Sequence, residues 1–250
     1  MTFDLYSKYY DLLYKDKPYD LEADYVFDTL TQQNSSIQKV LELGSGSGSH
    51  AYWLAQRGWE ITGIEKSESM VALAEAKHIK KFHPMQGDIT DFKLDKKFDA
   101  AISLFHVVSY LNSNEEVLDC FTNVNLHLVE GGLFLFDVWF TPGVYSQRPE
   151  TRIKRLSDGK VEIIRLAESE THYDANVVDV HYQILSREKG GNCMQFDELH
   201  KMRHFSAPEI ELFASQTGFI MVRMEEFVTR NKPSDKTWAI CFTLKKTKDV

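Results

Sequence analysis

The run Glu42-Leu43-Gly44-Ser45-Gly46-Ser47-Gly48-Ser49 decides how this chain folds. It overlaps the apolar stretch Lys39–Leu43, which predicts a strand, and precedes His50–Arg57, which predicts a helix ended by Gly58. Glycines in such a turn allow positive φ angles and let a ligand approach the backbone closely. The run therefore predicts a ligand-binding turn at the carboxyl end of a strand in an α/β sheet.

The spacing of the glycines separates two classes of ligand. Dinucleotide sites usually read G-x-G-x-x-G, with the pyrophosphate at the amino terminus of the following helix. Here the glycines are Gly44, Gly46 and Gly48, Ser49 takes the place of the third dinucleotide glycine, and Glu42 precedes the turn. A carboxylate there would repel a pyrophosphate but suits the ammonium group of a methionine moiety. An NAD-dependent oxidoreductase is therefore disfavoured.

Two further acidic side chains follow predicted strands. Glu65 ends the next strand, at the spacing from the glycine turn that is used to bind ribose hydroxyls, and its carboxylate can accept two hydrogen bonds from a cis-diol. Asp88 follows a short strand predicted over Pro84–Gly87 and can accept from an adenine amino group, with Ile89 and Met70 against the ring. Taken singly, each of these residues also has a purely structural explanation. Glu65 could cap a helix, Asp88 could form an Asx turn, and Met70 could pack in the core. Together, at the carboxyl ends of strands, they favour a nucleoside site.

The rest of the core repeats the strand–helix alternation. Alternating strands and helices imply parallel pairing through right-handed crossovers, so we expect a Rossmann-like, seven-stranded, mostly parallel sheet covered on both faces. The predicted elements include strands Phe98–Leu104 and Leu133–Val138, a helix Glu115–Leu128 ended by Gly131-Gly132, a helix Ala207–Thr217, and strands Phe219–Phe227 and Trp238–Leu244.

We expect three regions along the chain. Residues 1–149 contain amino-terminal helices and the ligand-binding core, and residues 206–250 return to the core sheet. Residues 150–205 are rich in Val, Ile and Tyr with partial alternation, which predicts a small inserted antiparallel sheet. Its strands are expected at Val161–Thr171, Val177–Ser186 and Met194–Phe205.

Composition excludes several classes of function. The formal net charge is -8 with no basic stripe, which disfavours a polynucleotide partner. The amino terminus lacks the pattern of a signal peptide, and no apolar run approaches the roughly 20 residues that span a bilayer. Three cysteines without metal-type spacing do not support zinc or another metal. We therefore expect a cytoplasmic protein that has no membrane or nucleic-acid partner.

The nucleoside-binding pattern resembles that of the class I S-adenosylmethionine-dependent methyltransferases. The likeness rests on Glu42-x-Gly44-x-Gly46-x-Gly48, Gly63-Ile64-Glu65-Lys66-Ser67-x-x-Met70 and Gly87-Asp88-Ile89-x-Asp91-Phe92, and it covers residues 38–140. The resemblance implies S-adenosylmethionine as cofactor and methyl transfer as the activity. It places Tyr14 and Leu104 in the cofactor site, together with Glu42, Gly44, Gly46, Gly48, Glu65, Met70, Asp88 and Ile89.

A narrower resemblance extends over most of the chain. Tyr10-Asp11-x-x-Tyr14, the segment Ser103–Leu111, Asp137-Val138-Trp139-Phe140-x-Pro142 and the inserted sheet look like the N,N-dimethyltransferases that act on nucleotide-linked (dTDP) amino sugars. These enzymes make dimethylamino sugars such as those of macrolide antibiotics. Pro18 departs from the family, in which this segment usually reads Lys-Asp-Tyr. The resemblance and the inserted sheet are compatible with a homodimer.

The resemblance also suggests residues on the acceptor side. It places a hydroxyl or imidazole group at Tyr110 to orient the nucleophile, with His106 close in sequence and Tyr10 as part of a lid over the donor. Trp139 could form a wall for a sugar or base, and Arg203 and Lys236 could bind a diphosphate. Aromatic residues are more often packing residues, and a lone Lys is usually solvated.

Other functions stay open at this point. The acceptor could be an unrelated small metabolite methylated on oxygen or nitrogen, with the same donor site and a different pocket. The chain could also be a nucleoside-binding regulatory protein without catalysis.

Overall fold

The computed structural model describes residues 7–191 and 193–250. The chain begins there with α1 (Ser7–Leu13) and α2 (Tyr19–Gln33), which are separated by a turn that contains Pro18. The part of the expected amino-terminal region before residue 7 lies outside the described residues. None of the helices in the described part combines the length and apolar character that crossing a membrane requires.

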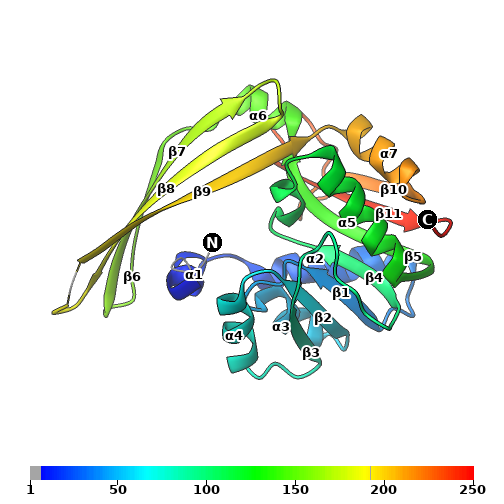
Figure 1. Cartoon of the computed structure of the whole chain (residues 1–250), viewed down its shortest axis with the longest axis horizontal. Helices are drawn as coiled ribbons and strands as arrows, with labels where there is room; N and C mark the ends of the chain where they lie inside the picture. The colour runs from blue at the N-terminus through cyan, green and yellow to red at the C-terminus, as the bar shows by residue number, and fades with distance from the viewer. Residues whose placement is uncertain (1–6, 192) are drawn as a thin grey trace.

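The core sheet has the predicted Rossmann-like arrangement (Figure 1). Five parallel strands and two antiparallel strands lie side by side. In spatial order they are β3 (Phe82–Gln86), β2 (Glu60–Glu65), β1 (Lys39–Leu43), β4 (Phe98–Ser103), β5 (Leu128–Phe140), β11 (Ala239–Lys246) and β10 (Phe219–Glu226).

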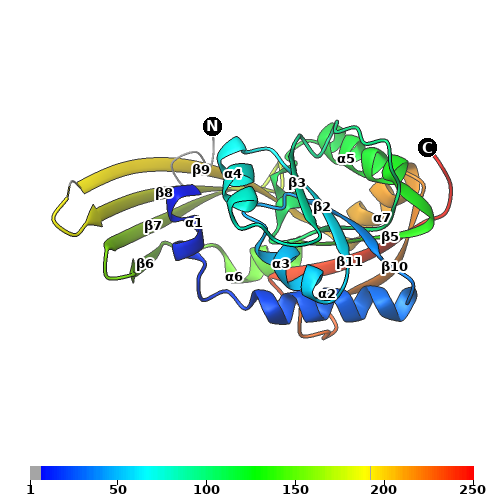
Figure 2. The same cartoon turned by 90° about the horizontal axis from the view of Figure 1, so that it is seen from below.

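Helices cover both faces of this sheet (Figure 2). α2 and α3 (Ser49–Gln56) bury apolar side chains against one face, and α5 (Asn114–His127) and α7 (Ala207–Gln216) bury theirs against the other. α4 (Glu68–Ala76) is capped by Ser67, whose hydroxyl accepts a hydrogen bond from the Met70 N–H. Both faces are therefore closed, and ligands can reach the sheet only at its edges.

The inserted sheet is longer than expected, and it is joined to the core. After α6 (Thr141–Gln147) the chain forms β6 (Arg152–Ser157), β7 (Val161–His172), β8 (Val177–Glu188) and β9 (Cys193–Phe205), paired antiparallel in that order. The end of β9 pairs with β5 in parallel through Trp139↔His204 and Phe140↔Phe205. The described strands therefore form one eleven-stranded sheet, in which the expected inserted antiparallel strands are confirmed and are joined to the core. α6 and β6 were not predicted.

The prediction that Gly131-Gly132 ends the preceding helix was also wrong. α5 ends at His127, and β5 starts at Leu128 and runs through both glycines. The register between β4 and β5 shifts between Phe98 and Ala100, because β5 carries extra residues there. Gly131 has φ +72°, so it supplies the irregular backbone of this bulge instead of a helix terminus.

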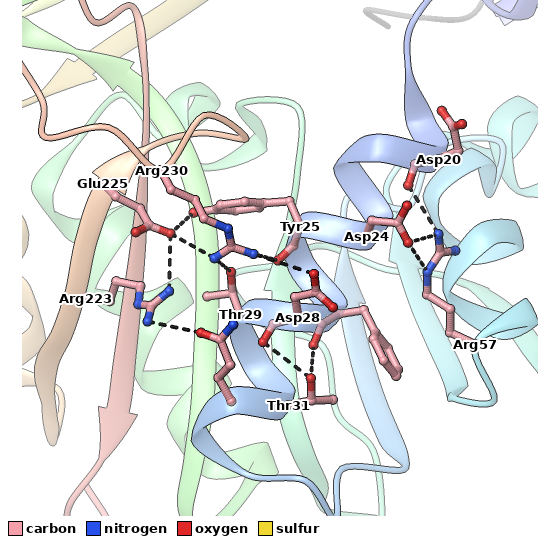
Figure 3. Close-up of polar contacts among 12 residues, drawn as sticks. Asp20, Asp24, Tyr25, Asp28, Thr29, Thr31, Arg57, Arg223, Glu225 and Arg230 are labelled. Carbon is pink, nitrogen blue, oxygen red and sulfur yellow. Dashed lines mark hydrogen bonds and ion pairs between the residues drawn. The ribbon is translucent and has the colours of Figure 1, made fainter.

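Polar contacts fix α2 over the sheet (Figure 3). The Arg57 guanidinium of α3 donates to the Asp24 carboxylate and to the Asp20 carbonyl. Toward the other end of α2, the Tyr25 hydroxyl donates to Glu225 of β10, and the Arg230 guanidinium reaches the same carboxylate. These contacts hold the start of α2 near the carboxyl ends of the parallel strands.

Candidate active site

The glycine turn closes tightly over the end of β2. The Gly44 and Ser45 N–H groups donate to the Ile64 carbonyl at 2.7 and 3.2 Å, and Gly44 has φ +66°. A Cβ on Gly44 would lie 2.5 Å from a methyl of Val107, whereas a Cβ on Gly46 would meet only the Met70 methyl at 3.6 Å. The first glycine is therefore required by packing, and the second leaves the backbone accessible to a ligand.

Glu65 is tied to this turn. One oxygen of its carboxylate accepts from the Gly46 N–H at 2.9 Å and the other from the Ser67 N–H at 2.8 Å. Burial raises the pKa of Glu65, although these N–H groups act in the opposite direction. The backbone thus fixes the carboxylate at the carboxyl end of β2, where its remaining lone pairs can accept from a diol.

Glu42 is the buried carboxyl of the site. Its side chain is 2% exposed, and Oε2 has no hydrogen-bond partner among the described residues. Burial and the neighbouring charge of Glu65 raise the pKa of Glu42 to about 8. A buried acidic oxygen without a donor is costly. A cationic or hydrogen-bond-donating ligand beside the glycine turn would remove this cost, so the residues present fit the ammonium end of the expected cofactor.

Asp88 follows β3 at the same edge of the sheet. Its Oδ1 accepts from the Thr90 N–H and hydroxyl, which makes an Asx turn, and its Oδ2 lies 2.7 Å from the Lys66 ammonium. Burial opposes ionisation of Asp88, but Lys66 and Thr90 lower its pKa below the usual range. Its predicted contact with an adenine amino group stays a prediction. Ile89 is partly buried against the core.

A cavity of about 370 Å³ opens next to the turn, around the residues that follow β4. His106 lies at its wall and directly precedes Val107, which contacts Gly44. Of the predicted site residues, Tyr14 and His106 line this cavity. The other lining residues are Asp16, Lys17, Glu22, Phe105, Asp137, Lys154, Phe227 and Ala239.

His106 is held in an uncommon conformation beside a buried carboxylate. Phe105 and His106 both have positive φ, +66° and +62°, which is rare for two successive side-chain-bearing residues. The His106 Nδ1 lies 2.6 Å from Oδ2 of Asp137, which is 1% exposed. Burial opposes ionisation of Asp137, but His106 and then Lys17 lower its pKa. Sequence reasoning did not assign Asp137 to the site.

Tyr110 lies at the end of the short 3-10 helix η1 (Val107–Tyr110), which was not predicted. Its hydroxyl is 2.6 Å from Nδ1 of His200 on β9, and Nε2 of His200 is 3.1 Å from Oε2 of Glu198. Sequence reasoning missed His200 and Glu198, because nothing in the alternating pattern of β9 indicates which residue of the core its inward side chains meet.

α1 lies between the inserted sheet and the glycine turn. The ring centroid of Tyr14 is 4.8 Å from that of Tyr10 and 5.0 Å from that of Phe105. The Ser47 hydroxyl of the turn donates to the Asp11 carboxylate at 2.8 Å. α1 therefore contacts the glycine turn, and its role as a lid stays a prediction.

The other predicted residues lie elsewhere. Trp139 packs against Trp238, and its ring centroid is 6.3 Å from that of His106. Arg203 is 6% exposed and donates to Asn114 at 2.8 Å, so it is a structural cation of the core. Lys236 lies in the exposed loop before β11. Leu104 is buried in the core, so only its backbone can face a ligand.

Comparison with known proteins agrees with this geometry. Residues 40–132, which contain the glycine turn, Glu65 and Asp88, match the family model of a methyltransferase domain. The chain therefore contains a methyltransferase domain. The unpartnered buried oxygen of Glu42 and the fixed carboxylate of Glu65 fit S-adenosylmethionine, the cofactor expected from the sequence.

Relatives of this methyltransferase span nearly its whole length. The dTDP-3-amino-3,4,6-trideoxy-alpha-D-glucopyranose N,N-dimethyltransferase of Streptomyces venezuelae is 27% identical over 86% of this chain and 90% of its own. The dTDP-3-amino-3,6-dideoxy-alpha-D-glucopyranose N,N-dimethyltransferase of Streptomyces fradiae is 24% identical over 85% and 82%.

Solved structures share the fold. An S-adenosylmethionine-dependent methyltransferase from Clostridium acetobutylicum superposes with a TM-score of 0.81 at 21% identity, covering 96% of both chains. The sugar N-methyltransferase KedS8 from Streptoalloteichus superposes with a TM-score of 0.82 at 21% identity, covering 96% of this chain and 93% of its own. The inserted sheet is therefore part of a shared architecture.

Proposed function

We propose that this methyltransferase methylates the amino group of a nucleotide-linked amino sugar. The relatives from Streptomyces are named for acceptors of this class. The cavity beside the donor turn is the observation that carries the proposal, since about 370 Å³ lies within the usual range of small-molecule pockets.

The charges at the cavity fit an acceptor that carries phosphate. Lys17 and Lys154 both line it; Lys17 is paired with Glu22, and Asp16 and Asp137 also line the cavity. Burial, and then the neighbouring Arg165, lower the pKa of Lys154, although Asp16 acts in the opposite direction. A diphosphate would offset the repulsion between Arg165 and Lys154. Lys17 and Lys154 take the role that the sequence suggested for Arg203 and Lys236.

The chain's own residues position the acceptor in this proposal. The bound cofactor supplies an activated methyl group, so alignment of the acceptor nitrogen is the main task of the protein. Tyr110 orients the nitrogen, and His106, oriented by Asp137, contacts it from the cavity wall. Tyr10 and Tyr14 close the site from α1, which keeps water away from the reacting groups. Trp139 borders the sugar.

Turnover with matched acceptors tests the proposal. Purified protein is incubated with labelled cofactor and with dTDP-linked 3-amino and 4-amino sugars, the same amino sugars without the nucleotide, and dTDP-linked sugars that carry hydroxyl groups only. We expect label only in the nucleotide-linked amino sugars, as N-methyl groups by mass spectrometry. Label in a hydroxyl sugar, or transfer only to unrelated metabolites in a cell extract, would contradict the proposal. Cofactor binding without any transfer would favour a regulatory protein.

A further inference from the structure

Three polar side chains form a hydrogen-bonded row from the inserted sheet into the core. Glu198 and His200 stand on β9, and Tyr110 stands at the end of η1, which β9 contacts. The side chains of His200 and Glu198 are 4% and 8% exposed. Burying a carboxylate and an imidazole is costly, so their presence here needs a reason beyond packing. His200 contacts the hydroxyl of Tyr110, the residue proposed to orient the acceptor.

The chemistry of the three groups fixes the direction of their hydrogen bonds. An ionised carboxylate can only accept, so Nε2 of His200, 3.1 Å from Glu198, carries a proton. In a neutral imidazole Nδ1 is then the acceptor, and the Tyr110 hydroxyl donates to it at 2.6 Å. Burial, and then the nearby Tyr14 and Tyr182, raise the pKa of Tyr110 well above its ordinary value, which keeps the phenol protonated. Its oxygen therefore presents lone pairs, and no proton, to an acceptor.

We propose that Glu198 and His200 are positioning residues that make Tyr110 the proton acceptor for the substrate amine. This inference rests on the proposed function, because it requires an amine that arrives as an ammonium ion. The N–H bond breaks and its electron pair stays on nitrogen as the lone pair that methyl transfer needs. The proton goes to the Tyr110 oxygen, the phenol proton goes to Nδ1 of His200, and the Nε2 proton goes to Glu198. The positive charge of the ammonium and the negative charge of Glu198 are both neutralised.

Among the residues that the structure describes, the aromatic and cationic groups beside the row do not accept the proton. The Tyr182 ring of β8 lies edge-on to His200 at 4.8 Å between centroids, and the Arg165 guanidinium of β7 lies over the Tyr182 ring at 4.7 Å. Arg165 also donates to the hydroxyl of Tyr14, which directly follows α1, at 3.1 Å. A guanidinium stays charged throughout the usual pH range and cannot accept a proton. Among the described groups of this cluster, the carboxylate of Glu198 is therefore the one that can take up the proton.

The test is the pH profile of Glu198→Gln and His200→Asn. We expect kcat at neutral pH to fall about 10²-fold or more, as for loss of a general base, while cofactor affinity by calorimetry stays within about twofold. The loss shrinks as pH rises and the amine arrives unprotonated. A uniform loss at every pH, or no loss, would overturn the relay. The matched control is Asp197→Asn on the exposed face of β9, which keeps the wild-type profile.

A second measurement needs no acceptor. Nitrogen NMR of His200 in the free protein is expected to show a protonated Nε2 and an unprotonated Nδ1, with the Nε2 signal changed in Glu198→Gln. A proton on Nδ1 would mean that His200 donates to Tyr110, which reverses the direction of these hydrogen bonds and overturns the inference. If His200 has the expected tautomer but no amino-sugar nucleotide is methylated, the proposed function fails on its own. Tyr110→Phe is then expected to leave the Nε2 proton of His200 in place.

Discussion

At the scale of single residues, Glu42 carries two opposed requirements. The free protein buries its carboxyl at 2% exposure beside Glu65, which favours the protonated form, yet the cofactor's ammonium group favours the carboxylate. The sequence predicted Glu42 as a cofactor residue from its place before the glycine turn. It could not predict the burial, because that depends on how α1 and the strands close around the turn.

We expect cofactor binding to release a proton from Glu42 near neutral pH, because the pKa of about 8 in the free protein falls when the ammonium binds. Calorimetry in buffers of different ionisation enthalpy measures this release. Glu42→Gln should abolish it and weaken binding about 10- to 100-fold, the range for a hydrogen bond to a charged group. Glu60→Gln, at the exposed start of β2, is the control. Unchanged affinity in Glu42→Gln would remove Glu42 from the site.

The same residue predicts a pH dependence of stability. The pKa of Glu42 is raised on folding, so its contribution to the free energy of unfolding is fully present below the ordinary carboxyl value of 4.5 and is lost as pH rises through about 8. In the cofactor-free protein, Glu42→Gln should therefore gain stability relative to wild type as pH rises across this window, as followed by urea denaturation. A constant difference between the two proteins from pH 5 to pH 9 would show that Glu42 does not cause it.

Gly44 allows a separate test of packing. A Cβ there would combine a left-handed backbone with a 2.5 Å contact to Val107. Strain of about 1–2 kcal/mol and overpacking of about 1–3 kcal/mol predict that Gly44→Ala loses about 2–5 kcal/mol of unfolding free energy. Gly58→Ala, where φ is also positive but no atom lies within 4 Å, should lose only the strain. Equal losses in urea denaturation would mean that the Val107 contact relaxes freely.

At the scale of elements, local pattern predicted the strands and helices of the core but not how they join. The predicted strands at residues 39–43 and 60–65 match β1 and β2, since burial on both faces leaves a continuous apolar run. η1 and the pairing of β9 with β5 depend on contacts far apart in sequence. For the same reason Asp137 was not assigned, and the roles suggested for Tyr110 and His106 remain predictions. Arg203 was suggested as a diphosphate ligand, yet its side chain is buried and donates to Asn114 and Glu209.

The position of α1 predicts how it moves. Its carboxylate Asp11 contacts Ser47 of the turn and the Lys77 ammonium, both partly exposed contacts that contribute about 0.2–1 kcal/mol each. Asp11→Ala should therefore speed cofactor dissociation several-fold in stopped flow and increase amide exchange in α1, with little change in global stability. Asp24→Ala, which removes a comparable contact between α2 and α3, is the control. Equal dissociation rates in the two variants would show that α1 does not retain the cofactor.

At the scale of the whole molecule, the cavity proposed as the acceptor site exists because the insert packs near the core. The cavity takes His106 and Asp137 from the core, Tyr14 and Lys17 from the amino-terminal segment, and Lys154 from β6 of the insert. Figure 1 shows the insert reaching from the core across α1, so the insert closes a site that the core alone would leave open. The donor site lies within the core. Changes in the insert should therefore affect the acceptor and spare the cofactor.

Lys154→Gln separates these two sites. If Lys154 binds a phosphate, its loss should raise the acceptor KM about tenfold and weaken the salt dependence of KM, because a partly exposed ion pair is screened by ions. The cofactor Kd should stay unchanged, although Lys154 also donates to the Leu13 carbonyl of α1, which makes cofactor affinity the check on an indirect effect. Lys160→Gln, at the exposed turn after β6, is the control for net charge. A rise in cofactor Kd that matches the rise in acceptor KM would mean that Lys154 only holds α1 in place, and the anion would then have to bind elsewhere in the cavity.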